Sequence, residues 1–381
     1  MITALTNGRV LTDRGVVERR AVLIENGHIR GLVNDSEIPF GVRHHDLCGG
    51  LLLPGFIDTQ VNGGGGVLFG DNPSVETLRR IGAAHAHFGT TGFLPTLISG
   101  DFGLIRAAIA AVEAAIEADV PGVIGIHIEG PFLNKTRKGI HDAANFRPLD
   151  AEAVALVTSV RRGKTVVTLA PEQTTPQTIA ALVKAGVIVS AGHTDGSYAQ
   201  IRAGLDAGMS GFTHLFNAMS PLRAREPGAV GAALDDAESY CGIIVDGKHV
   251  DPATLRIALR CKRADRLMLV TDAMPSVGDA AKRFTLQGRT ITVKDGVCVA
   301  PDGTLAGSDL DMASAVRNAM AMLGLDLNAA VTMATRNPAR FLGLENQTGA
   351  IREGLQADLV CVDDAFAVRD IWIKGHHARL A

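Results

Sequence analysis

The chain has 381 residues, of which 46% are hydrophobic and 20% charged, and its formal net charge is −3. This balance is typical of a globular protein with a large core, built as two domains or as one large barrel with an appendage. The sequence has no basic stripe for nucleic acid and no polybasic cluster for a membrane surface, so we expect neither as a partner.

The cysteines and the N-terminal residues both indicate a cytoplasmic protein. The 5 cysteines include no CxxC pair and mostly stand in apolar runs, as expected for reduced, buried thiols. Residues 1–5 lack the basic segment and the following apolar segment of a signal peptide. No apolar run approaches the roughly 18 residues that a membrane span needs.

Both ends of the chain show a pattern of short strands. Asn26 and Gly27 form the residue pair favoured in tight hairpins. The two ends are expected to pair into one small β domain, because nearby termini are common in domain architecture. The strands are expected at residues 8–12, 20–24 and 28–33, and again at 349–351, 357–362 and 368–375.

The middle of the chain alternates strands with helices. About eight strands in this order predict a (β/α)8 barrel. A doubly wound sheet is the alternative, but it would gather site residues at one crevice instead of from strands along the whole segment. The expected strands are 51–58, 92–97, 122–129, 165–170, 187–193, 211–214, 241–246 and 267–272. The expected helices are 74–88, 105–118, 151–160, 176–185, 198–207, 252–260 and 311–323.

The segment after the last barrel strand has the alternation of a β-hairpin, with Asp-Gly turns at 295–296 and 302–303. We expect it to form an insertion over the barrel mouth, near residues 283–300. The predicted domains are therefore a β domain of residues 1–50 and 346–381 and a catalytic barrel of residues 51–345.

Four of the strand-like runs end in a polar side chain that can bind a metal or transfer a proton. These are Glu129, His193, His214 and Asp272. In a parallel barrel such strand ends converge on one face, where active sites are built. A single buried histidine is usually a satisfied core residue, but four convergent polar groups would each cost stability without a partner. The pattern therefore predicts an active site.

The residue types at these four positions indicate metal-assisted hydrolysis. Glu129, His193 and His214 offer one carboxylate and two imidazoles, which is the ligand set of a catalytic divalent metal with an open position for water. Zinc is favoured, and Fe2+, Co2+ or Mn2+ would also fit. Such an ion lowers the pKa of water to about 7 and polarises a carbonyl. Asp272 is placed to take the proton of the water and pass it to a leaving amine. The structural alternative for Glu129 is a helix cap or an ion pair.

Six motifs, in their order along the chain, resemble the N-acetylglucosamine-6-phosphate deacetylase family of the amidohydrolase superfamily. Each motif is weak alone, whereas their combination is highly specific, and the resemblance extends from the N-terminal strands to residues 357–360. The motifs are IHIEGPF at 126–132, AGHT at 191–194, THLFNAM at 213–219, VDGKH at 245–249, VTDA at 270–273 and LAGS at 305–308.

This resemblance implies a (β/α)8 TIM-like barrel with a small β-sandwich formed by the N- and C-terminal segments. It implies hydrolysis of N-acetyl-D-glucosamine 6-phosphate to D-glucosamine 6-phosphate and acetate, in amino-sugar catabolism and cell-wall sugar recycling. The expected partner is thus a small-molecule amino-sugar phosphate.

The resemblance also assigns roles by motif position. Glu129, His193 and His214 become the metal ligands, and Asp272 becomes the catalytic acid and base. His249 would polarise the scissile carbonyl or hold the phosphate. The remaining expected substrate contacts are Ile140, His141, Asn217, Ala218, Arg225, Leu305, Ala306 and Gly307. Ile140 stands where relatives often have alanine.

One departure from the superfamily concerns the first barrel strand, which commonly ends in a His-x-His pair for a second metal. Here the corresponding residues are Gln60 and Asn62. Amides are poor ligands beside imidazoles, so one tightly bound divalent ion per subunit is expected. The alternative interpretation is that Gln60 and Asn62 only form hydrogen bonds with the water of the site.

Arg223 and Arg225 lie in a loop bounded by glycine and proline, and a planar guanidinium suits a phosphate dianion. Arg223 is as well explained as a solvated surface residue, whereas Arg225 falls on the family position. The loop could reach the site of a neighbouring subunit, so a homodimer is expected.

Three alternatives stay open. The same reaction on N-acetylgalactosamine 6-phosphate differs only in one hydroxyl orientation, which the sequence does not resolve. Another amidohydrolase, dihydroorotase-like or aminoacylase-like, would be expected to carry the His-x-His pair and often a bridging lysine. A non-catalytic scaffold would be expected to have lost the metal ligands or Asp272, and all four residues are present.

Overall fold

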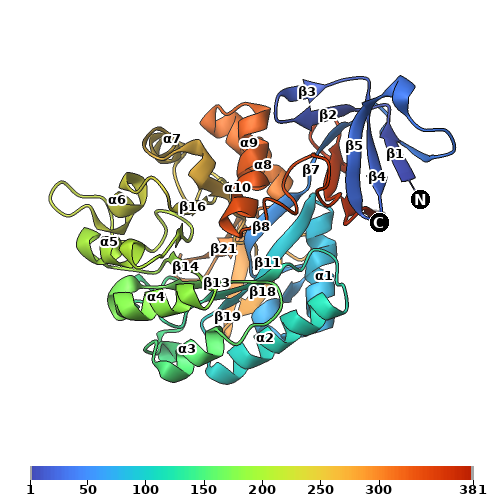
Figure 1. The fold of residues 1–381 in the computed structure, drawn as a ribbon. Coiled ribbons are helices and arrows are strands. Elements are labelled where there is room, and N and C mark those ends of the chain that lie inside the picture. Colours follow the sequence, from blue (N-terminus) through green and yellow to red (C-terminus); the bar gives the residue numbers. More distant parts are fainter. Residues whose placement is uncertain (1, 379–381) are drawn as a thin grey trace.

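A computed structural model describes residues 2–378 of the chain. Residue 1 and residues 379–381, which the predicted β domain includes, lie outside the described residues. Figure 1 shows a barrel wrapped by helices, with a smaller part made of strands packed beside it and holding both chain ends.

Eight parallel strands form the barrel, and they follow one another in chain order from β8 to β17. The backbone N–H of Asp272 donates to the carbonyl of Gln60 at 3.0 Å, and Val61 bridges to Ala273, so the last strand meets the first. The strand order never reverses, so the predicted barrel is confirmed and the doubly wound alternative is wrong. The strands are β8 (Phe56–Val61), β11 (Thr90–Ile98), β12 (Gly125–Glu129), β13 (Lys164–Leu169), β14 (Ile188–Ala191), β15 (Gly211–Phe212), β16 (Tyr240–Ile243) and β17 (Leu267–Leu269).

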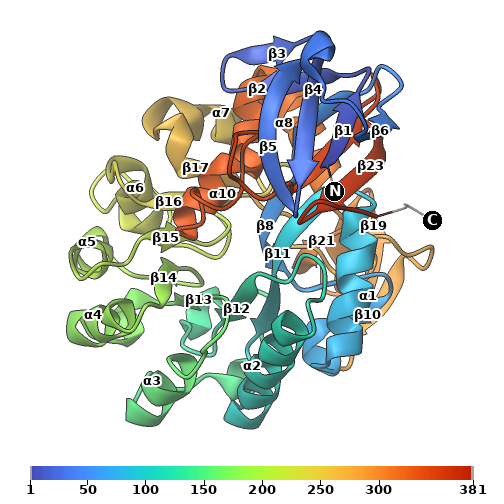
Figure 2. The ribbon, with the colours of Figure 1, turned by 45° about the vertical axis from the view of Figure 1, so that its right-hand side comes forward.

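Helices form a layer outside these strands, as Figure 2 shows for α2 to α7. The predicted cap of the first helix is present, since the Ser74 side chain accepts from the Thr77 N–H. The second helix begins three residues earlier than expected, because Asp101 caps it by accepting from the Leu104 N–H. Three helices, α6, α9 and α10, were not predicted. The helices are α1 (Val75–Ala86), α2 (Phe102–Glu117), α3 (Ala151–Val157), α4 (Pro176–Lys184), α5 (Tyr198–Asp206), α6 (Gly228–Asp235), α7 (Pro252–Cys261), α8 (Met312–Leu323), α9 (Leu327–Ala334) and α10 (Arg336–Phe341).

The two chain ends build a β-sandwich of a four-stranded and a six-stranded sheet. The two ends meet as predicted, since His28 bridges to Gln356 and one sheet holds both β2 and β22. The strand that joins them, β7, comes from the stretch that was expected in the barrel, and it pairs with β22 in antiparallel register. Leu5, Leu52 and Trp372 pack in the core between the sheets. The first sheet is β5 (His28–Asn34), β4 (Arg20–Glu25), β1 (Ile2–Thr6) and β6 (Arg43–Asp46). The second is β24 (His376–Ala378), β23 (Val368–Ile373), β22 (Leu359–Val362), β7 (Leu51–Pro54), β2 (Arg9–Thr12) and β3 (Gly15–Val17).

The single strand predicted over residues 51–58 is wrong, because the structure divides it at Gly55. Residues before this point belong to the sandwich as β7, and residues after it begin the barrel as β8. Gly55 donates its N–H to the carbonyl of Asp358 at 2.8 Å, and a Cβ at Gly55 would lie only 2.2 Å from Thr91 Oγ1. Glycine thus allows the close approach at which the chain passes from one sheet to the other.

A four-stranded antiparallel sheet follows the last barrel strand, in the region where a hairpin insertion was expected. Its apolar side packs Leu286, Ile291 and Ala306 against Met274. The strands are β18 (Arg283–Leu286), β19 (Arg289–Lys294), β20 (Val297–Val299) and β21 (Leu305–Ser308). The predicted domain limits at residues 50 and 345 stay a prediction. Within residues 2–378, no helix has the length and apolar character needed to cross a bilayer.

Candidate active site

A cavity of about 350 Å³ opens at the C-terminal ends of the barrel strands. Almost all of the side chains singled out from the sequence line it. Those that do are Asn62, Glu129, Ile140, His141, His193, His214, Asn217, Ala218, His249, Asp272, Leu305, Ala306 and Gly307. Two of the predicted residues do not line it: Gln60 lies behind the cavity wall, and Arg225 is exposed on a loop.

The polar centre of the cavity is a cluster of three buried side chains. Glu129 Oε1 lies 3.2 Å from His193 Nε2 and 3.0 Å from His214 Nε2. The two imidazole Nε2 atoms are 3.1 Å apart. All three side chains are at most 6% exposed. Three donor atoms from three different strand ends therefore meet at one point.

The hydrogen bonds of His193 determine what this cluster can hold. Its Nδ1 lies 2.8 Å from the carbonyl oxygen of Arg137, which can only accept, so Nδ1 carries the proton. With the outer nitrogen bound to this carbonyl, Nε2 is the nitrogen that faces the Glu129 carboxylate and the His214 Nε2. Acceptor atoms that converge in this way need a proton or a cation between them, and a carbonyl that fixes the outer nitrogen is the usual support of a metal-ligating histidine. The donor set therefore fits a divalent metal ion of the zinc type.

The backbone is strained where the site residues leave their strands. His193, His214 and Asp272 have φ angles of 47°, 36° and 52°, in the left-handed region that non-glycine residues rarely adopt. Each such conformation costs about 1–3 kcal/mol, and it persists only where the surrounding structure fixes it. This backbone conformation turns the three side chains toward the cavity shortly after their strands end.

Asp272 is half-buried and is held by two side-chain amides. Its Oδ1 accepts from Asn62 Nδ2 at 2.7 Å and from Gln60 Nε2 at 3.1 Å. Burial, followed by the negative charge of Glu129, raises the pKa of Asp272 to about 6. A carboxyl with a pKa near neutrality can both accept and release a proton under ordinary conditions.

Gln60 connects the two carboxylates of the site, whereas Asn62 bonds only Asp272. Gln60 Nε2 also lies 3.3 Å and 3.4 Å from the two oxygens of Glu129, so one amide approaches both carboxylates. The buried Oδ1 of Asn62 has no hydrogen-bond partner among the described residues, which leaves an acceptor at the cavity.

Two further histidines line the cavity in defined orientations. His249 Nδ1 pairs with Asp246 Oδ2 at 2.5 Å, and both side chains are at most 6% exposed. His141 Nδ1 accepts from the Ser99 N–H at 3.3 Å, so the proton of this ring sits on Nε2. Burial, followed by the charge of nearby His193, lowers the pKa of His141 to about 3. His141 is therefore a neutral hydrogen-bond donor.

The strand β21 forms another part of the cavity wall. It contributes Leu305, Ala306 and Gly307, which were expected to contact the substrate. Gly307 has a φ of 67°, and a Cβ there would lie 2.7 Å from the carbonyl oxygen of Asp272. Only glycine lets this strand approach the catalytic region so closely.

Sequence reasoning missed the residues that support the site from behind. Asp246 stood inside a quoted motif but was given no role, although a carboxylate three residues before a candidate histidine could have indicated it. Arg137 contributes a backbone carbonyl, which no residue pattern reveals. Asp58 is fully buried in the first barrel strand, and its Oδ2 accepts from Thr271 Oγ1 at 2.5 Å. Burial raises the pKa of Asp58 to about 7.

Barrel, sandwich and buried carboxylate–imidazole cluster together define a metal-dependent hydrolase of the amidohydrolase type. Residues 51–377 match the model of the amidohydrolase family, and residues 3–52 match that of the NagA composite domain. The chain belongs to the amidohydrolase family, as the sequence motifs predicted.

Relatives extend over almost the whole chain. An N-acetylgalactosamine-6-phosphate deacetylase from Shewanella sp. (strain ANA-3) is 45% identical, covering 96% of this chain and 93% of the relative. An N-acetylglucosamine-6-phosphate deacetylase from Haemophilus influenzae is 35% identical, covering 98% of each. The crystal structure of N-acetylglucosamine-6-phosphate deacetylase from Pasteurella multocida superposes with a TM-score of 0.96 at 33% identity, covering 100% of both chains.

Proposed function

We propose that this chain hydrolyses the acetamido group of N-acetyl-D-glucosamine 6-phosphate and releases D-glucosamine 6-phosphate and acetate. The observation that carries the proposal is the convergence of Glu129, His193, His214 and Asp272 on one cavity. It is supported by full-length relatives that are deacetylases of N-acetylated amino-sugar phosphates.

Glu129, His193 and His214 would hold one divalent ion, and zinc suits two imidazoles and a carboxylate. When bound, that ion would supply a Lewis acid for the carbonyl and a water of lowered pKa. Asp272, held by the amides of Gln60 and Asn62, takes the proton of the attacking water. The water oxygen bonds to the acetyl carbon, the C–N bond breaks, and Asp272 returns the proton to the departing amine nitrogen.

The other cavity residues bind and orient the substrate. His249, which Asp246 holds through its Nδ1, would contact the acetamido carbonyl or the phosphate. His141 offers its Nε2–H to a sugar or phosphate oxygen. Ile140, Asn217 and Ala218 line the same wall, and the segment Leu305–Gly307 closes over the sugar or acetyl group.

Phosphate recognition is expected to need a second subunit. Arg137 lines the cavity, but its guanidinium is paired with Asp195 at 2.8 Å. Arg225 is exposed on a loop outside the cavity. We therefore propose a homodimer in which Arg225 reaches the phosphate in the neighbouring subunit's cavity. We also propose a cytoplasmic location, which the free cysteines support.

The galactosamine epimer is a second candidate substrate, because the 45% identical relative is an N-acetylgalactosamine-6-phosphate deacetylase. The experiment compares kcat/KM for both 6-phosphates and for unphosphorylated N-acetylglucosamine. The proposal expects the glucosamine phosphate to be preferred over both. A larger kcat/KM for the galactosamine phosphate would transfer the assignment to the epimer. An equal kcat/KM for unphosphorylated N-acetylglucosamine would refute the proposal that the enzyme acts on a sugar phosphate.

A further inference from the structure

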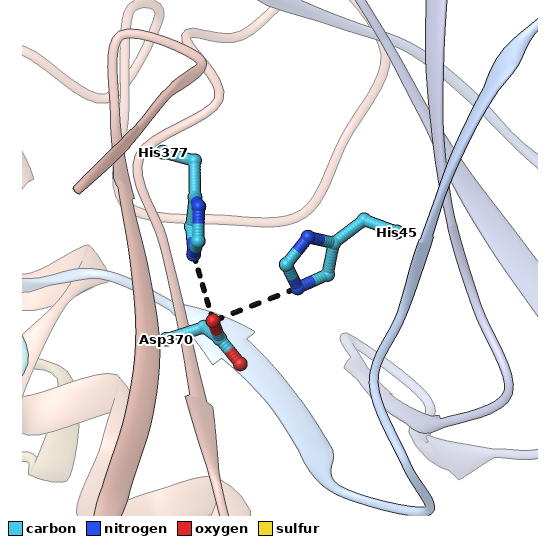
Figure 3. A group of neighbouring side chains, drawn as sticks. All are labelled: His45, Asp370 and His377. Atoms are coloured by element: carbon cyan, nitrogen blue, oxygen red, sulfur yellow. Dashed lines mark hydrogen bonds and ion pairs between the residues drawn. The ribbon is translucent and has the colours of Figure 1, made fainter. Parts of the chain in front are cut away.

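A second group of metal-binding side chains lies in the sandwich, outside the cavity. It consists of His45, Asp370 and His377, which Figure 3 shows pointing toward one another. His377 Nε2 lies 2.7 Å from Asp370 Oδ1, and His45 Nε2 lies 3.5 Å from the same oxygen. None of the three lines the catalytic cavity.

The topology brings these residues together from the two ends of the chain. His45 stands on β6 at the edge of the four-stranded sheet, where it pairs with Leu5. Asp370 and His377 stand on β23 and β24, at the edge of the six-stranded sheet. In the β23–β24 hairpin, His377 lies directly opposite Trp372. Trp372 is two residues beyond Asp370 on the same strand, so Asp370, Trp372 and His377 project from one face of the sheet. The cluster therefore spans the open edge of the sandwich.

The two imidazoles are positioned by an aromatic side chain between the sheets. Trp372 is 2% exposed, and its ring meets the His45 ring edge-on with centroids 5.0 Å apart. The His377 ring lies 5.1 Å from the same indole. Packing against a buried ring limits the rotamers of both histidines, which lowers the entropic cost of bringing their nitrogens together.

We propose that His45, Asp370 and His377 form a second binding site for a divalent ion of the zinc type, which ties the N-terminal segment to the C-terminal hairpin. Their ligand atoms lie within 4.8 Å of one another, and tetrahedral zinc ligands are separated by about 3.3 Å. Small side-chain rotations would therefore close the site. Two imidazoles and one carboxylate select zinc, cobalt or nickel over magnesium and calcium. The side chains are 25–32% exposed, so the fourth position is open to water and the ion can exchange.

The experiment separates this site from the catalytic one by variants of tag-free, full-length protein. Zinc content after dialysis against zinc-containing buffer is expected to be two ions per wild-type chain. Glu129→Gln and His377→Gln should each retain one ion, and the double variant none. His376→Gln, which changes the neighbouring exposed histidine outside the cluster, is the matched control and should retain two.

A second measurement, amide hydrogen exchange, tests whether the bound ion holds the two ends of the chain together. In the Glu129→Gln background, added zinc should slow amide hydrogen exchange in β6, β23 and β24, and the additional His377→Gln change should abolish this slowing. His377→Gln alone should keep the deacetylase activity of the wild type. The proposal is overturned if Glu129→Gln protein binds no zinc, or if its ion and its exchange protection survive His377→Gln.

Discussion

Replacing Asn62 with alanine is expected to shift the acid limb of the pH–rate profile to higher pH. Asn62 donates to Asp272 Oδ1 at 2.7 Å and is one of the groups that lower the pKa of this carboxyl. Without that bond the ionised form is less stable, so the pKa of Asp272 rises above its value of about 6. More alkaline conditions are then needed before Asp272 can accept the proton of water.

The hydrogen bond gives the size of the shift. A hydrogen bond to a charged group contributes about 1.5–3 kcal/mol, and one pKa unit corresponds to about 1.4 kcal/mol. Gln60 remains as a donor at 3.1 Å, so the lower end applies and we expect a shift of about one pH unit.

The assay is kcat/KM for acetate release between pH 5 and 9 with metal-loaded enzyme. Asn217→Ala is the matched control, because Asn217 also lines the cavity but donates to the backbone carbonyls of His214 and Leu215. It should change KM without moving the acid limb. An unmoved limb in Asn62→Ala, or an equal shift in both variants, would refute this account of Asp272.

Three further changes test other parts of the site. Asp272→Asn should keep the fold and the bound metal but lose most turnover, which single-turnover kinetics and metal analysis would show; near-normal turnover would contradict its role. Arg225→Ala should raise KM for the phosphosugar and leave kcat nearly unchanged, and an unchanged KM would remove Arg225 from phosphate binding. The difference in the free energy of unfolding between Asp58→Asn and the wild type should shift in favour of the variant as the pH rises. The shift should be about 1.4 kcal/mol for each unit between pH 5 and 7. The pKa of Asp58 is raised from 3.8 to about 7, so its stabilising contribution is present below pH 4 and is lost as the pH rises through 7. Urea unfolding at several pH values measures this, and a pH-independent difference would contradict it.

The sequence was sufficient to predict the barrel and the convergence of four polar side chains at its strand ends for a physical reason. Parallel strands in chain order bring their C-terminal ends to one face, so Glu129, His193, His214 and Asp272 could be grouped without knowing any distance. The family motifs added most of the cavity wall. The sandwich followed from strand-like patterns at both ends, and the sheet that contains both β2 and β22 confirms it.

Other features could not be predicted, because they depend on tertiary contacts. The left-handed φ of His193 and the carbonyl of Arg137 that fixes its tautomer are backbone properties. The division of one predicted strand at Gly55 depends on the close approach of Thr91. His45 and Asp370 meet only after two sheets pack together, so no local pattern reveals their cluster.

Acetate release from N-acetyl-D-glucosamine 6-phosphate by metal-stripped protein, with and without added zinc, tests the central claim most directly. The account expects release only when metal is restored in the wild type, and none in Glu129→Gln under either condition. Release that is equally fast without metal, or that survives Glu129→Gln, would contradict the assignment of Glu129, His193 and His214. No release by folded, zinc-loaded wild type would contradict the proposed substrate.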